Sequence, residues 1–305
     1  MFESIKKKLN HLFYHKFSQK EERNLLLLAK LLLDKVKVKG EVPSLSEVEL
    51  RVYSQWGEDG IIQYIINNID IPNKIFVEFG VENYEEANTR FLLVNDNWSG
   101  LIIDGSEKNI NFIKKDPIYA KNDLLAIHSF ITKNNINQII KENIDLEDIG
   151  LLSIDIDGND YWIWNAIEVI NPRIVICEYN SVFEADKRIT VPYKEDFFRS
   201  SEHFSNLYFG ASLKALCTLA EEKGYDFIGS NSSGVNAFFI RKDLSAPFKK
   251  YNSSSGYIES KHRESRDNNG NLTFLRGKAR LHAIKDMTVV DLDLNKESRI
   301  KDLNK

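Results

Sequence analysis

The sequence has little cysteine and no long uninterrupted apolar run. Its 305 residues contain two cysteines, Cys177 in an apolar strand pattern and Cys217 in a helical one, without the spacing of a zinc site. We expect both to be small buried hydrophobes in a reducing compartment. The run Leu25–Leu33 is short and interrupted by Lys30, so we expect no transmembrane segment.

A basic balance is also absent. The formal net charge is −4, so the chain as a whole gives no electrostatic reason to expect nucleic acid as a partner. The basic start is followed by His, Phe, Tyr and Lys rather than by the apolar core of a secretory signal, and we expect a cytoplasmic protein. Hydrophobic content of 42% and charged content of 28% are ordinary for a soluble globular enzyme.

The first 48 residues have a helical pattern and contain no glycine or proline before Gly40. We expect a helical N-terminal appendage over 1–48, with Leu25–Leu33 as its second helix. It would pack on the core or on another subunit, which makes a homo-oligomer one expectation. Because Lys6–Lys8 precede Phe13 and Tyr14, a membrane-surface helix is the alternative.

The centre of the chain holds two apolar runs that end in acidic residues. Leu151–Ile156 ends at Asp155 and Asp157, and Ile174–Cys177 ends at Glu178. Helical spacing between the runs predicts a strand–helix–strand unit, which closes right-handed into a parallel pair. The three carboxylates would then face the crevice where open α/β sheets bind ligands.

Two interpretations of these acids remain open. Asp157–Asp160 could be a turn in which Asn159 or Asp160 caps the next helix. Asp155 lies within the apolar run, so its carboxylate needs a donor, a cation or a ligand. Together with Glu178 and Asn180, these residues offer oxygen ligands for Mg²⁺, Mn²⁺ or Ca²⁺, and the metal-free alternative has Asp157 or Glu178 as a direct base.

Two earlier apolar runs also end in acids. Lys74–Gly80 contains Glu78, and Gly100–Ser106 contains Asp104. An acidic residue after the second strand, following a glycine turn after the first, is the arrangement that holds a ribose diol. The acidic loop Val81–Glu86 would repel a pyrophosphate, so a nucleoside without phosphates fits better than a dinucleotide.

The remaining pattern predicts an α/β fold with a mostly parallel sheet and a C-terminal antiparallel hairpin. We expect a main domain over 49–245 and a lid or tail segment over 246–305, with Asp291–Lys305 partly disordered. The further elements expected are helices at Glu58–Ile66, Ala87–Val94, Ser106–Lys115, Ile136–Glu142, Asp160–Ile170 and Ala211–Lys223, and strands at Ala126–Thr132, Tyr225–Gly229 and Asn236–Arg241.

Several segments together resemble the FkbM-type S-adenosylmethionine-dependent methyltransferase family. They are Tyr53–Gly60 (YSQWGEDG), Phe76–Gly80 with Asn88 and Thr89, Gly100–Asp104, Leu152–Asp160 (LSIDIDGND), the hairpin Gly234–Ile240 and the tail segment Arg263–Thr288. The resemblance covers about residues 50–245 and part of the tail. It implies a Rossmann-like class I methyltransferase fold and methyl transfer to a hydroxyl of a sugar, polyketide or other natural product.

The resemblance also implies site residues. Glu78 and Gly80 would lie at the methionine end of S-adenosylmethionine, Asp104 would bind the ribose, and Asp123 or Asn122 would reach the adenine. The full cofactor set implied is Gln55, Glu78, Gly80, Thr89, Asp104, Asp123 and Asp155. The catalytic and metal set, Asp155, Asp157 and Glu178, follows instead from the acids that converge at the two neighbouring strand ends. The sequence departs from the family in having one glycine in the first loop and Asp157 where Glu is common.

The expected function is O-methylation of a sugar or sugar-derived acceptor, such as a surface-polysaccharide precursor, with Mg²⁺ or Mn²⁺ as an optional cofactor. In the tail, His262, His282, Arg276 and Arg280 suggest a lid that clamps a phosphorylated acceptor, or else a solvated loop turning at Asn268–Gly270. Two other functions compete: a metal-dependent glycosyltransferase that uses Asp155-x-Asp157, and a catalytically silent scaffold that binds a partner through residues 1–40.

Overall fold

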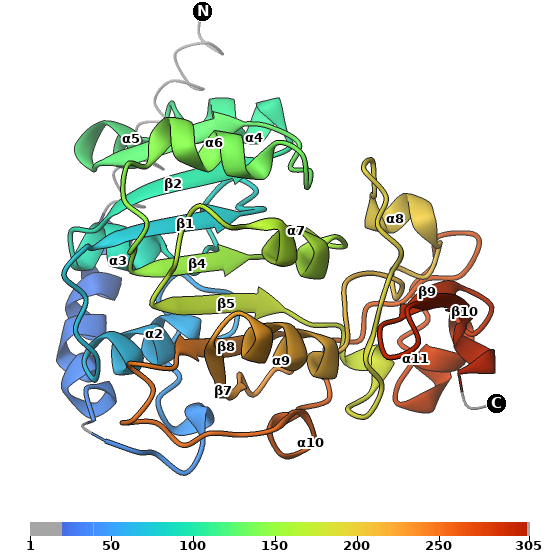
Figure 1. The fold of residues 1–305 in the computed structure, drawn as a ribbon. Helices are drawn as coiled ribbons and strands as arrows, with labels where there is room; N and C mark the ends of the chain where they lie inside the picture. The colour runs from blue at the N-terminus through green and yellow to red at the C-terminus, as the bar shows by residue number, and fades with distance from the viewer. Residues whose placement is uncertain (1–19, 39, 304–305) are drawn as a thin grey trace, which may run out of the picture.

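A seven-stranded sheet forms the centre of the protein in the computed structural model, which describes residues 20–38 and 40–303 (Figure 1). The strand order is β3-β2-β1-β4-β5-β8-β7, and β8 runs antiparallel to both neighbours. The strands are β1 (Ile75–Phe79), β2 (Ser99–Asp104), β3 (Leu124–His128), β4 (Leu151–Ile154), β5 (Ile174–Glu178), β7 (Tyr225–Ser230) and β8 (Asn236–Arg241). This arrangement confirms the predicted Rossmann-like α/β fold with a C-terminal hairpin.

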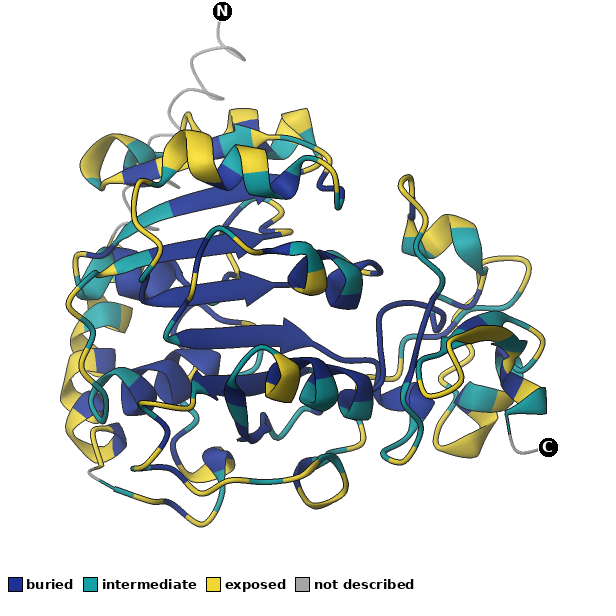
Figure 2. Ribbon diagram, viewed as in Figure 1, coloured by how far each residue is buried: buried dark blue, intermediate teal, exposed yellow. Residues whose placement is uncertain are grey.

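The strands are apolar on both faces because helices cover both faces. Successive strand residues point to opposite sides, so Phe76 joins one buried cluster while Val77 joins the other. Figure 2 shows the central strands as almost entirely buried. The helices on the Phe76 side are α2 (Glu58–Ile66), α3 (Arg90–Asn95), α4 (Glu107–Ile113) and α5 (Pro117–Lys121), and those on the Val77 side are α6 (Ile136–Asn143), α7 (Asp160–Ala166) and α9 (Leu213–Glu222).

Some predicted boundaries were wrong. The third strand was expected at Ala126–Thr132 but ends at His128, because residues 129–132 leave the sheet. The helix expected from Ala87 begins at Arg90, since the backbone before it is held by a buried carboxylate of β1. Helix α7 ends at Ala166, short of the predicted Ile170.

A second, smaller sheet was not predicted. It has the order β10-β9-β6 and is built from β6 (Ile189–Thr190), β9 (Thr288–Asp291) and β10 (Lys296–Arg299). Phe183 and Phe209, which precede the final hairpin, share one apolar cluster with Ile284 and Val289 of the tail. We call residues 181–209 and 257–303 the cap; it lies beyond the arrowheads of the central strands in Figure 1.

The cap also corrects the expectation for the C-terminus. Asp291–Lys305 was predicted to be partly disordered, yet β10 and the short helix η3 (Ile300–Asp302) lie within it. Ile300 is buried in the cap cluster, which gives this polar stretch an apolar anchor. The tail thus packs jointly with residues 181–209. The remaining short helices are η1 (Leu45–Glu47), η2 (Ser181–Phe183), α8 (Arg199–Glu202), α10 (Ser253–Gly256) and α11 (Lys278–Ala283).

The N-terminal appendage packs against the main domain through residues 20–36, which are helical. Ala29 and Leu33 are buried in a cluster with Phe91, and Tyr53 donates to the Glu22 carboxylate at 2.8 Å. The helix predicted at Leu25–Leu33 is therefore present; the one predicted before it lies outside the described residues. Within those residues, no helix is both long enough and apolar enough to cross a membrane.

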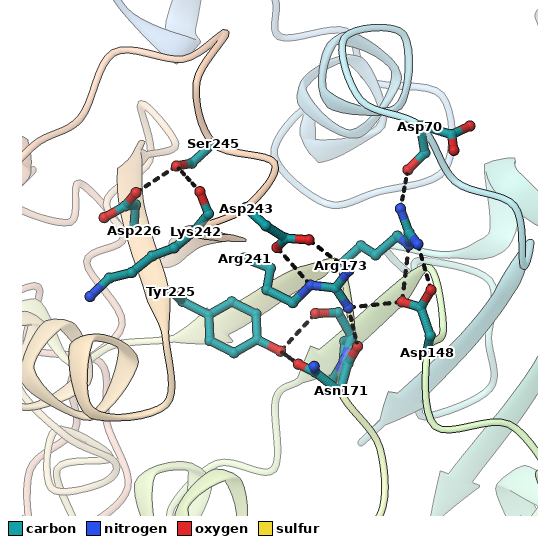
Figure 3. Close-up of polar contacts among 11 residues, drawn as sticks. Asp70, Asp148, Asn171, Arg173, Tyr225, Asp226, Arg241, Lys242, Asp243 and Ser245 are labelled. Carbon is teal, nitrogen blue, oxygen red and sulfur yellow. Dashed lines mark hydrogen bonds and ion pairs between the residues drawn. The ribbon is translucent and has the colours of Figure 1, made fainter.

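At the amino ends of the strands, an ion-pair network ties the hairpin to the parallel strands (Figure 3). Asp148, just before β4, accepts from Arg173 Nε at 3.0 Å and Nη2 at 2.5 Å, and from Arg241 Nη1 at 2.8 Å. Arg241 also pairs with Asp243 at 2.8 Å. These hydrogen bonds, led by Arg173, lower the pKa of the Asp148 carboxyl. Each charge in this network faces an opposite one.

Candidate functional site

A cavity of about 810 Å³ lies along the opposite edge, between the carboxyl ends of the strands and the cap. The strand order fixes which residues line it. Asp104 ends β2, Gly80 follows β1, Asp155 follows β4 and Glu178 ends β5, so these residues line the cavity in that spatial order. Sequence-distant residues thus meet at one edge, as the parallel topology requires.

The segment Tyr53–Gly60 is wrapped around a buried carboxylate. Asp59 Oδ2 accepts from the backbone N–H groups of Val52, Tyr53 and Ser54 at 2.7–2.8 Å and from the Ser54 hydroxyl at 2.8 Å. Burial raises the pKa of Asp59 to about 6. The folded loop places Gln55, a predicted cofactor ligand, at the cavity. The role of Asp59 was not foreseen from the sequence.

Gly80 permits a close approach of two strand ends. Its φ is +70°, and a Cβ there would lie 1.6 Å from the carbonyl oxygen of Asp155. Any side chain at this position would have to push β1 and β4 apart. The single glycine of the first loop is therefore required by the packing of the backbone at the cavity floor.

Glu78 and Thr89, predicted as cofactor ligands, contact each other instead of the cavity. The Glu78 carboxylate accepts from the backbone N–H of Asn88 at 2.9 Å, and from the Thr89 N–H at 3.1 Å and hydroxyl at 2.5 Å. Burial raises the pKa of Glu78. Neither residue is among those lining the cavity, so both position the start of α3.

Asp104 lines the cavity with its carboxylate largely engaged. Oδ2 accepts from Glu82 N at 2.8 Å, and Oδ1 accepts from Ser106 N at 2.8 Å and Asn109 Nδ2 at 3.1 Å. A carboxylate offers about four lone-pair sites, so about one remains for a ligand hydroxyl. Glu82 and Glu86 are exposed and also line the cavity, and Glu82, whose backbone N–H binds Asp104, could accept a second hydroxyl.

Asp123 lies at the amino ends of the strands, at the opposite side of the sheet from the cavity. It precedes the first residue of β3, where it accepts from the Ser99 hydroxyl at 2.6 Å, and neither it nor Asn122 lines the cavity. The adenine role came from the resemblance alone, and in this chain Asp123 directly precedes β3 and so lies at the amino end of that strand. Phe130 and Ile131, which follow β3, line the cavity in their place, and Phe130 is 46% exposed.

Asp155, Asp157 and Glu178, which we call the acid cluster, come together as predicted. Each contributes an oxygen that lies within 4.8 Å of the other two. Burial, and then repulsion from the neighbouring acids, raises the pKa of Asp155 and of Glu178 well above the usual range. Glu178 Oε2 is buried and has no hydrogen-bond partner within the described residues. This donor set matches the oxygen ligands that Mg²⁺ and Mn²⁺ prefer.

Arg199, a residue of the cap, forms an ion pair with the acid cluster. Arg199 Nη1 donates to Asp157 Oδ1 at 2.5 Å, its Nε donates to the Asn206 carbonyl at 2.9 Å, and its guanidinium lies 3.7 Å from the Phe209 ring centroid. Arg199 lowers the pKa of both Asp155 and Glu178, but burial outweighs it. This contact was not predicted, since 42 residues separate Arg199 from Asp157.

Two neighbouring polar residues have structural roles. Asp160 accepts from Ile156 N at 2.8 Å and Gly158 N at 2.9 Å, so it fixes the loop that carries Asp157. Asn180, considered above as an oxygen ligand, accepts from the N–H of Val182 and donates to carbonyls of the cap. Its amide oxygen is thus already engaged.

The tail reaches the cavity, as the lid interpretation requires. His262 and Arg280 line it, whereas Arg276 and His282 are exposed and do not. The turn predicted at Asn268–Gly270 is present, closed by a 2.9 Å bond from Gly270 N to the Asp267 carbonyl. Of the four basic tail residues considered, two therefore belong to the site.

No family model matches the chain, and no curated protein matches it. Solved structures resemble it in part. An O-methyltransferase from Bacillus cereus in complex with SAH is 13% identical over 55% of this chain and 72% of that one, with a TM-score of 0.35. A SAM-dependent methyltransferase from Aquifex aeolicus is 8% identical over 60% and 88%, with a TM-score of 0.35. PKMT2 from Rickettsia typhi in complex with AdoHcy is 10% identical over 63% and 54%, with a TM-score of 0.40.

Proposed function

We propose that the chain is an S-adenosylmethionine-dependent methyltransferase of the FkbM type that methylates a hydroxyl of a sugar or sugar-derived acceptor. The observation that carries the proposal is the order of groups along one cavity. Asp104 lies over β2, where a ribose hydroxyl can donate to it, and the acid cluster lies over β4 and β5. The cofactor then occupies the β1–β2 half, and the acceptor occupies the half that holds the cluster.

The residues of the cofactor half fit a nucleoside. Asp104 keeps about one acceptor site, and Glu82 lies beside it. Phe130 and Ile131 offer apolar surface for a base, a contact that needs no charged partner. Gly80 and Gln55 line the stretch toward the acid cluster, where the methionine end would lie. When bound, S-adenosylmethionine supplies a methyl group on a sulfonium, from which sulfur leaves readily.

In the acceptor half, the acid cluster serves as proton acceptor. Bound S-adenosylmethionine would supply the methyl group and would retain the leaving electron pair on its sulfur, while a carboxylate of the cluster would take the proton that the attacking hydroxyl loses. Asp155 and Glu178 suit that step, since a raised carboxyl pKa makes the ionised form a stronger base. Asp157 carries the pairing with Arg199, which limits the charge of the cluster.

A divalent cation fits the same cluster. Mg²⁺ or Mn²⁺ would be held by Asp155, Asp157 and Glu178, and the unpartnered Glu178 Oε2 supports this assignment. When bound, such a cation would lower the pKa of the acceptor hydroxyl. The direct role of a carboxylate as base is the metal-free form of the same proposal.

The first test measures the binding of S-adenosylhomocysteine through its effect on the thermal unfolding of the purified protein. A ligand at a hundredfold excess over its dissociation constant stabilises by about 2.7 kcal/mol. We expect the wild type and D123N to be stabilised alike, and D104N to be stabilised much less. The two variants remove the same charge from opposite sheet edges, so D123N is the matched control.

The parallel arm uses a uridine-diphosphate sugar with Mn²⁺. Stabilisation by that pair alone, with no response to S-adenosylhomocysteine, would replace methyl transfer with glycosyl transfer through Asp155-x-Asp157. If neither ligand stabilised the protein, the result would favour the catalytically silent scaffold. Titration of Mg²⁺ or Mn²⁺ into chelator-treated protein tests the metal: we expect stabilisation that D155N abolishes. Cytoplasmic location and a homo-oligomer through the N-terminal helix remain predictions.

A further inference from the structure

Arg280 is a buried cation that forms no ion pair with any of the described residues. The residue is 8% exposed, lies in α11 and lines the cavity. Its one hydrogen bond to another residue within the described chain runs from Nη1 to the carbonyl oxygen of Ser260 at 3.1 Å, and its Nε is buried with no acceptor. Burial of a charged group without a partner is unfavourable, and a guanidinium carries five N–H donors. Most of the N–H donors of Arg280 therefore have no acceptor among the described residues.

The position of Arg280 is fixed by the segment that crosses the end of β5. Tyr179 donates to the Ile258 carbonyl at 2.6 Å, Tyr257 donates to the Ser181 carbonyl at 2.8 Å, and Ser260 N donates to the Ser181 hydroxyl at 3.0 Å. Because Ser260 also accepts from Arg280, the guanidinium is held at the end of the cavity that adjoins β5. That is the acceptor half, next to the acid cluster.

The two arginines of the cavity differ in what they can do. Arg199 is committed to Asp157 and to the Asn206 carbonyl, and it acts on Arg280 by repulsion. Burial lowers the pKa of Arg280 and outweighs the attraction of Glu259, and no carboxylate within the described residues lies close enough to form an ion pair with it. A ligand anion would therefore pair with Arg280 without displacing a protein carboxylate.

We propose that Arg280 forms the oxyanion subsite of the acceptor, so that the acceptor is a sugar bearing a phosphoryl or carboxylate group. Both groups present the paired oxygens that a guanidinium binds through two parallel N–H donors. The proposal rests on the proposed function for the identity of the acceptor half. It makes Arg280 a specificity-determining residue and assigns the cap to acceptor recognition.

Binding of small anions tests the subsite. Inorganic phosphate, glucose 6-phosphate, glucuronate and glucose are titrated into the wild type, R280Q and R276Q, by calorimetry. We expect the anions to bind the wild type more tightly than glucose, and R280Q to bind them about ten- to a hundredfold more weakly. R276Q should match the wild type, since Arg276 is an exposed residue of the same tail that does not line the cavity.

The comparison of glucose 6-phosphate with glucuronate identifies the anion. R280K, which keeps the charge and loses the fork, should bind with intermediate affinity, and it replaces R280Q if that variant does not fold. Anion binding equal in wild type and R280Q, or no anion binding at all, would overturn the subsite. S-adenosylhomocysteine is titrated into the same variants: retained binding there, with anion binding independent of Arg280, refutes the subsite alone and leaves the methyltransferase proposal intact.

Discussion

The amino ends and the carboxyl ends of the parallel strands, called here the amino edge and the carboxyl edge, differ in how their charged side chains are paired. At the amino edge, the single carboxylate of Asp148 receives two arginines, and its pKa is lowered (Figure 3). At the carboxyl edge, three carboxylates share Arg199, and the pKa values of Asp155 and Glu178 are raised. The cap and its cavity lie only at the carboxyl ends of the strands, and there the acids outnumber their basic partners.

A lowered carboxyl pKa and a raised one have opposite consequences for stability. The ionised form of Asp148 is favoured in the folded state, so near neutral pH this residue stabilises the protein. The ionised forms of Asp155 and Glu178 are disfavoured, so their contribution is present at low pH and is lost as pH rises. Unfavourable charge is retained where a ligand or a reaction requires it, which is why we place function at the carboxyl edge.

The largest effect should come from neutralising the acid cluster. We expect D155N to lower methyl-transfer turnover by about 10²–10⁴-fold, since it removes the proton acceptor and metal ligand. The same change should leave the free energy of unfolding unchanged or raise it by up to about 2 kcal/mol at neutral pH, because an amide carries no charge to bury. Urea unfolding in the presence of a chelator measures this, and a clear loss of stability in D155N would contradict the contrast between the edges.

The second effect concerns the cation of the cluster. R199Q should lower the free energy of unfolding by about 1–2 kcal/mol, an amount kept small because the side chain of Asp157 is 58% exposed. Adding D157N should recover much of that loss, since the double variant no longer has the unpaired carboxylate.

R188Q is the matched control for R199Q. Arg188 pairs with Glu222 at 3.0 Å and Asp293 at 3.7 Å, away from the cluster. We expect its loss of stability to be the same with and without D157N. Equal rescue of R188Q and R199Q by D157N would mean that Arg199 acts through general packing of the cap rather than through the cluster.

The residues at the carboxyl edge were partly predictable, because the parallel topology determines which strand ends lie together. Once apolar runs ending in acids are taken as neighbouring parallel strands, Asp104, Asp155 and Glu178 must meet at one edge. Asp123 failed for a different reason: the resemblance carried it to the adenine, whereas it directly precedes β3 and so lies at the amino ends of the strands. Glu78 shows a second limit, since the sequence does not tell whether a carboxylate at a strand end faces a ligand or the next turn of backbone.

The cap could not be predicted because its contacts join distant segments. β6 has two residues and pairs Ile189 with Asp291 across the chain, so neither strand has a local pattern of sufficient length. Arg199 and Arg280 reach the cavity only through that pairing and the shared apolar cluster. The basic tail did suggest a lid that includes Arg280, whereas no local pattern linked Arg199 to Asp157, 42 residues away.

The smallest effect is expected at the amino edge, where D148N should lower the free energy of unfolding by about 1 kcal/mol, since the Asp148 side chain is 37% exposed and screened by water. The loss should hold near neutral pH and shrink as pH falls below about 4, where the carboxyl of the unfolded wild-type chain takes up a proton while the folded one, with its lowered pKa, resists it. D70N is the matched control, because Arg173 contacts only the backbone carbonyl of Asp70, at 2.7 Å. For D155N the difference from wild type should instead grow as pH rises. If D148N and D155N showed the same sign and the same pH trend, charge at the two edges would not be handled differently, and the acid cluster would be ordinary structural charge.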